Sequence, residues 1–123
     1  MDQIMKDRSP EESGAPHLPT LELAGELDLA VAALLSEQLD ALFSEGAISI
    51  VVDLLRATFL DSTALGVLVN ALNRCRDMGG QLHLIVRESQ ILRVLTITGL
   101  TDAFSVHNSR HELENGIEEL WKR

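Results

Sequence analysis

ISIVVDLLRATFLDSTALG, residues 48–66, is the stretch of sequence that decides the expected fold. It begins with an apolar run, residues 48–54, whose β-branched residues are typical of a strand covered on both faces. A short linker then ends at Asp61 and Ser62, after which the apolar residues change to helical spacing. A strand that leads into a helix in this way places the Ser62 hydroxyl on the surface, beside the unpaired N–H groups of the first helical turn.

Strand and helix patterns alternate along the rest of the chain. The expected strands are residues 21–23, 48–53, 82–86 and 103–106. The expected helices start near Asp28, Ser62, Ser89 and Ser109, and glycines 46, 79–80 and 99 end the first three. Strands joined by helices of this length imply right-handed crossovers. We therefore expect a single α/β domain with a mostly parallel β-sheet and crossover helices.

The start of the chain differs from the rest. Residues 1–16 are polar, contain Pro10, Gly14 and Pro16, and show no sustained periodicity. We expect them to form a flexible N-terminal tail, followed by the folded domain over residues 17–123. An antiparallel edge strand around Ile4 and Met5 is the alternative for part of this tail.

The composition excludes several classes of function. The net charge of -9 disfavours binding to nucleic-acid phosphates and anionic lipid, and 3% aromatic residues with no Tyr are too few for base stacking. Cys75 is the only cysteine, so no intrachain disulfide can form. The four histidines lack metal-binding spacing, and no phosphate-binding glycine loop is present. We expect a cytoplasmic protein without metal or cofactor that contacts neither nucleic acid nor membrane directly.

Two loops are expected to form one surface patch. In parallel sheets, functional groups collect beyond the carboxyl ends of the strands. Residues 25–28, which include Gly25 and Asp28, and residues 56–62, which include Asp61 and Ser62, both lie at that end of the predicted sheet. Asp28 is also a plausible helix cap.

Ser62 itself allows three interpretations, and the residues alone leave them open. It can cap the helix. It can be phosphorylated, which adds a charge of about -1.5 to -2 that a helix N-terminus tolerates but a docked partner would meet as a new charge. It can be a hydrolase nucleophile, although the Gly-x-Ser-x-Gly elbow is missing and only His83 and His107 are remote candidates for a base. Thr63 is a second hydroxyl that could be modified instead of Ser62.

Several short motifs together resemble a known family. They are LAGELD at residues 23–28, VDL at 52–54, FLDSTALGVL at 59–68, GG at 79–80 and ITGL at 97–100. In order and spacing they are similar to bacterial anti-sigma factor antagonists, also called anti-anti-sigma factors, which have the STAS domain. This chain has Thr63-Ala64 where the family commonly has Ser-Gly. The family's usual N-terminal hairpin finds little support in polar residues 5–16.

The resemblance implies a STAS-like domain that acts as a binding switch and not as an enzyme. Members of the family bind an anti-sigma factor, often a serine kinase, and so regulate sigma-factor-dependent transcription. Phosphorylation of the residue that matches Ser62 (alternatively Thr63) would release the partner, and a PP2C-type phosphatase would restore binding. The partner-facing residues would be Gly25, Asp28, Asp61, Ser62 and Thr63. The alternative is a STAS interaction or scaffold module in another stress-signalling complex, without a serine switch.

Overall fold

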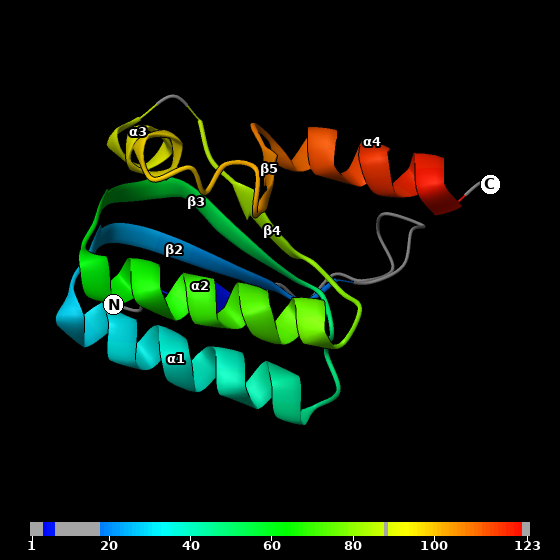
Figure 1. Ribbon diagram of the computed structural model, residues 1–123, viewed down its shortest axis with the longest axis horizontal. Coiled ribbons are helices and arrows are strands. Elements are labelled where there is room, and N and C mark those ends of the chain that lie inside the picture. Colours follow the sequence, from blue (N-terminus) through cyan, green and yellow to red (C-terminus); the bar gives the residue numbers. More distant parts are fainter. Residues whose placement is uncertain (1–3, 7–17, 88, 122–123) are drawn as a thin grey trace.

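Five strands form one sheet in the order β1-β2-β3-β4-β5 in the computed structural model, which describes residues 4–6, 18–87 and 89–121 (Figure 1). The strands are β1 (Ile4–Lys6), β2 (Thr20–Leu27), β3 (Ile50–Leu60), β4 (Leu82–Ile85) and β5 (Ser105–His107). β1 pairs with β2 in antiparallel fashion, and all other neighbours pair in parallel. The expected α/β class with a mostly parallel sheet is therefore confirmed.

The antiparallel edge strand expected around Ile4 and Met5 is present as β1. The polar sequence offered little support for a strand pairing at the N-terminus. So short a strand can still form, because it pairs with β2 through its backbone and needs no apolar alternation. The rest of the expected tail, residues 1–3 and 7–16, lies outside the described residues. The domain boundary at residue 17 therefore stays a prediction.

Within the described residues, four helices cover the two faces of the sheet. They are α1 (Leu29–Ser44), α2 (Ser62–Asp77), α3 (Gln90–Ile97) and α4 (Arg110–Trp121). α1 and α2 lie side by side against one face, and α3 and α4 lie on the other (Figure 1). The chain thus has three layers, with the sheet in the middle.

The main hydrophobic core lies between the sheet and the α1–α2 layer. The predicted apolar faces of these helices are buried, including Leu35 and Leu39 of α1 and Leu68 and Leu72 of α2. Cys75 is also buried in this core, and burial raises the pKa of its thiol while the charge of Arg74 opposes that rise. A smaller cluster of Val51, Ile85 and Leu113 packs on the α4 side.

Gly79 and Gly80 end α2 as expected. Gly79 has φ +83, and the N–H groups of Gly79 and Gly80 donate to the carbonyls of Arg76 and Cys75 at 3.0 and 2.7 Å, which is the Schellman arrangement. A Cβ on Gly80 would overlap the carbonyl oxygen of Ile48. Only glycine therefore lets the end of α2 pass this close to the chain that enters β3.

Several predicted strand boundaries are wrong. β2 and β3 continue to Leu27 and Leu60, so most of residues 25–28 and 56–62 are paired strand and not loop. Parallel pairing overrides the weak local signals there, and register shifts accommodate the extra residues of β3. β3 begins at Ile50, two residues later than predicted. β5 begins at Ser105, because Phe104 is buried in the preceding turn and its N–H donates to the Leu100 carbonyl.

Candidate functional site

Two aspartates cap neighbouring helices at one edge of the sheet. Leu27 and Leu60 are register partners at the ends of β2 and β3, and Asp28 and Asp61 directly follow them. Asp28 Oδ1 accepts the N–H of Val31 at 3.1 Å, and Asp61 Oδ1 accepts the N–H of Ala64 at 2.8 Å. The Asp61 N–H also donates to the Leu27 carbonyl at 3.2 Å, which ties the two ends together. The expectation that residues 25–28 and 56–62 share one surface is confirmed, although both are largely strand. We call this surface, with Asp28, Asp61, Ser62 and Thr63, the carboxyl edge.

Ser62 is the first residue of α2 and not its cap. Asp61 has the extended backbone of an N-cap, with φ -86 and ψ 172, and its carboxylate holds the capping bond. The interpretation of Ser62 as a helix cap is therefore wrong. β3 ends at Leu60, so the next residue, Asp61, occupies the capping position. Within the described part of the chain, the exposed Ser62 hydroxyl has no hydrogen-bond partner. The fold itself makes no use of this hydroxyl.

Thr63 occupies different surroundings from Ser62. It is exposed, but it lines a groove of about 330 Å³ between α1 and α2, together with Asp40, Gly66 and Arg74. Ser62 does not line this groove. The two neighbouring hydroxyls therefore open onto different parts of the surface.

Gly25 shapes the end of β2. Its φ is +79, and the register between β2 and β3 shifts immediately after it, from Gly25↔Ala57 to Glu26↔Phe59. A positive φ of this size is readily adopted only by glycine. Gly25 thus sets the path of the chain toward Asp28.

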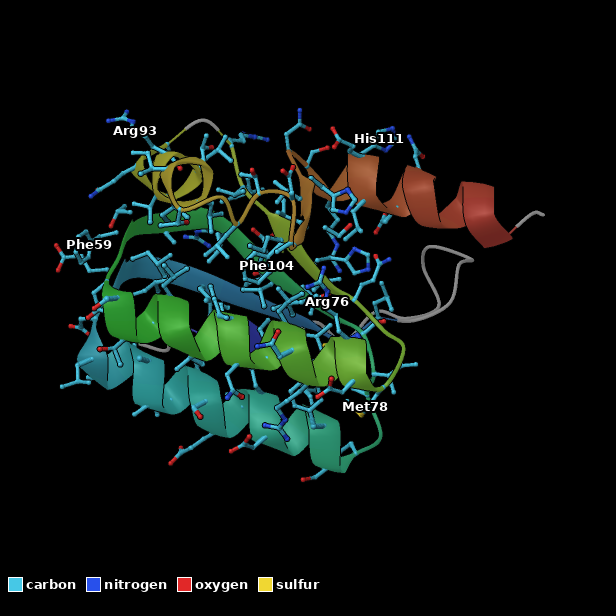
Figure 2. All side chains as sticks on the ribbon, viewed as in Figure 1. Phe59, Arg76, Met78, Arg93, Phe104 and His111 are labelled. Carbon is cyan, nitrogen blue, oxygen red and sulfur yellow. The ribbon has the colours of Figure 1, made fainter. Side chains whose placement is uncertain are left out.

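Two large apolar side chains are exposed at the carboxyl edge. Leu29, the first residue of α1, is 67% exposed, and Phe59, near the end of β3, is 38% exposed. Phe59 lies at the end of the molecule where α1 and α2 begin (Figure 2). Sequence reasoning missed both residues. Each belongs to an apolar stretch, and nothing in such a stretch marks which member faces outward.

The two histidines considered as remote bases lie together, but far from Ser62. His83 of β4 and His107 of β5 bring Nδ1 and Nε2 to 3.3 Å, and Ser105 Oγ lies 3.0 Å from the same Nε2. His83 is in register with Val51, whereas Ser62 follows the opposite end of β3. At about 3.3 Å per residue, the strand between them is roughly 30 Å long. This separation argues against the hydrolase interpretation.

Burial dominates the electrostatics of this pair. Burial, with a smaller contribution from the charge of His107, lowers the pKa of His83 from 6.5 to about 4. Burial also lowers the pKa of His107, although Glu112, 3.9 Å away, opposes that shift. Both imidazoles are therefore neutral near neutral pH.

The described residues contain neither a metal-binding cluster nor a membrane-spanning helix. No group of three or more His, Cys, Asp or Glu side chains there could hold a metal ion. None of the helices there is long and apolar enough to cross a membrane.

Comparison with known proteins identifies the family. The STAS domain model matches residues 9–113. The anti-sigma-B factor antagonist of Bacillus subtilis is 34% identical over 86 residues, covering 70% of this chain and 78% of the relative. That of Listeria monocytogenes is 32% identical over 91 residues, covering 74% and 80%.

Solved structures show the same fold. An anti-sigma factor antagonist from Mycobacterium paratuberculosis superposes with a TM-score of 0.78 at 18% identity, covering 94% of this chain and 92% of the other. The anti-sigma factor antagonist SpoIIAA, in its unphosphorylated form, superposes with a TM-score of 0.70 at 17% identity, covering 98% and 99%. With a matching domain model, relatives above 30% identity and the shared three-layer fold, this chain belongs to the STAS domain family.

Proposed function

We propose that this protein is an anti-sigma factor antagonist that binds an anti-sigma factor through its carboxyl edge and is released when Ser62 is phosphorylated. The observation that carries the proposal is the exposed Ser62 hydroxyl, which the fold leaves unused beside the capping carboxylate of Asp61. Relatives named anti-sigma-B factor antagonist support the function. SpoIIAA, which has the same fold, has been solved in both an unphosphorylated and a phosphorylated form.

The position of Ser62 suits a modification that changes binding and spares the fold. A phosphate adds about -1.5 to -2 charge, and the N-terminus of α2 stabilises such a charge by roughly 0.3–1 kcal/mol. That gain offsets repulsion from Asp61 within the folded protein. A partner docked on the same edge would have to accommodate the phosphate. A loss of about 3 kcal/mol in binding free energy weakens affinity roughly a hundredfold, which is enough for a switch.

Ser62 is favoured over Thr63 because of where the two hydroxyls lie. Thr63 lines the groove between α1 and α2, whereas Ser62 stands outside it at the very start of α2. The proposed partner is an anti-sigma factor that is itself a serine kinase, with a PP2C-type phosphatase reversing the modification. The protein would act in the bacterial cytoplasm, where sigma factors direct transcription, and would bind without catalysing a reaction.

Titration of the cognate anti-sigma kinase tests the proposal. Ser62→Ala should bind as tightly as the unmodified protein, and Ser62→Glu should bind roughly a hundredfold more weakly. Thr63→Ala serves as the matched control for the modified position and should be phosphorylated by the kinase as the unmodified protein is. After incubation with kinase and ATP, mass spectrometry should find phosphate on Ser62.

Three results would overturn the switch. Equal affinity of the Ser62→Ala, Ser62→Glu and unmodified proteins would show that the position does not control binding. Binding without phosphate on Ser62 or Thr63 would instead indicate a STAS scaffold. A serine-directed phosphonate that labels Ser62 covalently would indicate a hydrolase.

A further inference from the structure

Leu29 and Phe59 expose apolar surface at the same carboxyl edge as Ser62. From this geometry we infer that the two side chains, here called the apolar pair, are the anchors through which the unmodified protein holds its anti-sigma factor. Phosphorylation of Ser62 would then place a dianion inside a contact that has to be dry. This inference rests on the proposed function and adds to it the chemistry of the partner's surface.

The register of β2 and β3 places Leu29 beside Ser62. Leu27 pairs with Leu60, Asp28 and Asp61 cap the two helices, and Leu29 and Ser62 are the first residues of α1 and α2. The two residues therefore occupy equivalent positions at the starts of neighbouring helices. Because α1 and α2 pack side by side, Leu29 and Ser62 lie at the same end of this helix pair.

Phe59 approaches the same serine from the sheet. It lies three residues before Ser62 and pairs with Glu26 at the end of β2. Leu60, the next residue, is only 6% exposed because its side chain enters the core, so Phe59 points to the opposite side of the strand. The two exposed side chains of the apolar pair thus come from two different elements, α1 and β3, that meet at the carboxyl edge.

The side chains of the apolar pair lie outside the hydrophobic core. Leu29 is 67% and Phe59 38% exposed, whereas their neighbours Leu27 and Leu60 are buried. Apolar side chains gathered within a polar rim are typical of protein-binding surfaces, and buried aromatic anchors carry much of the binding energy there. The rim here consists of the Asp28 and Asp61 carboxylates.

The charges identify the kind of partner that fits. Each capping carboxylate uses Oδ1 for its backbone bond, and the described residues offer Oδ2 no further hydrogen bond or ion pair. These oxygens can accept from Arg or Lys side chains of a partner. The matching surface is therefore a protein with an apolar pocket bordered by basic residues. Nucleic acid and anionic lipid do not fit, since their phosphates would be repelled by the two carboxylates and by the net charge of -9.

A dry contact changes how phosphorylation should respond to salt. Repulsion between charges in water is screened over about 10 Å at 0.1 M salt and weakens further as salt is added. The cost of removing water from a phosphate between two apolar anchors is screened much less. The affinity lost on phosphorylation should therefore persist at high salt.

The chain offers a matched control for alanine substitution. Ile48 and Met78 are 46% and 44% exposed, comparable to Phe59. Met78 lies at the opposite end of the molecule from Phe59 (Figure 2), and the Ile48 carbonyl is next to Gly80, just after Met78. We expect Leu29→Ala and Phe59→Ala each to weaken binding to the purified anti-sigma factor by about 10- to 100-fold. Ile48→Ala and Met78→Ala should change the dissociation constant by less than about threefold. Phe59→Thr replaces the ring by a β-branched residue that also favours a strand, and it should reproduce the loss if Phe59→Ala unfolds the protein.

The outcomes separate this inference from the proposed function. If the unmodified protein does not bind the anti-sigma factor, the proposed function fails. If it binds and Ser62→Glu releases it, while both apolar-pair variants bind normally, the inference is overturned and the switch stands. The inference is also overturned if the phosphorylation penalty, compared at about 0.05 and 0.5 M salt, disappears at the higher concentration.

Discussion

Acidification should destabilise this protein through the histidine pair on β4 and β5. His83 Nδ1 lies 3.3 Å from His107 Nε2, and the groups that face this pair are Ser105 Oγ at 3.0 Å and Glu112 at 3.9 Å. Burial lowers the pKa of His83 from 6.5 to about 4. Protonating His83 puts a charge in a partly buried site where the imidazole of His107 is its hydrogen-bond partner.

The sign and size follow from the two pKa values. Between the folded value of about 4 and the unfolded value of 6.5, the unfolded chain binds the proton more strongly. Stability is therefore full above the unfolded pKa and is lost as the pH falls toward the folded one. At about pH 5, linkage lowers the free energy of unfolding by roughly 2 kcal/mol for a fully buried group. Because the His83 ring is partly exposed, solvent screening reduces this loss to about 1–2 kcal/mol. His107, whose pKa is also lowered, contributes in the same direction.

Urea denaturation followed by circular dichroism at about pH 8, 6 and 5 measures this effect. The free energy of unfolding should fall over this range, and the fall should be smaller for His83→Gln, which keeps a polar group but cannot gain a proton. An equal fall in the unmodified protein and in His83→Gln would refute the reasoning. So would a free energy of unfolding that does not change between about pH 8 and pH 5.

Two further predictions concern helix ends and their controls. Gly80→Ala should lower the free energy of unfolding by about 3 kcal/mol, because its Cβ would overlap the Ile48 carbonyl. Gly66→Ala has open space around it in α2 and should raise the free energy of unfolding by about 0.5–1 kcal/mol. Similar denaturation midpoints for the two variants would contradict this prediction. Asp61→Ala should cost about 1 kcal/mol through the lost cap, and Asp61→Asn much less. Equal destabilisation by Ala and Asn in the same urea titration would show that the charge, and not the cap, matters.

Much of the fold could be predicted because its signals are local. The α1 face of Val31, Leu35, Leu39 and Leu42 repeats at helical spacing and is buried as a whole. The Ser89 hydroxyl accepts the N–H of Leu92 at 3.4 Å as the expected cap of α3. Such spacing and capping signals depend on residues within one or two turns of each other, so they can be recognised in the sequence without knowledge of tertiary contacts.

The candidate site could be predicted only in part. The motif around Ser62 and the second segment at Asp28 were recognisable, and their common edge followed from the topology of parallel strands. Which residue caps α2 depended on where β3 ends, and that end is set by pairing with β2 at Leu27↔Leu60. A strand boundary decided by a neighbouring strand carries no reliable local signal.

The sequence by itself determined the order of strands and helices, the helix ends and the serine that opens α2, because each depends on the chemistry of neighbouring residues. Only the tertiary structure decided that Asp61 caps α2 and leaves the Ser62 hydroxyl unused. It also decided that Leu29 and Phe59 face outward beside Ser62, whereas Leu27 and Leu60 enter the core. The physical reason is that exposure and capping depend on which strands pair and in what register, and register is a property of contacts between segments far apart in the chain.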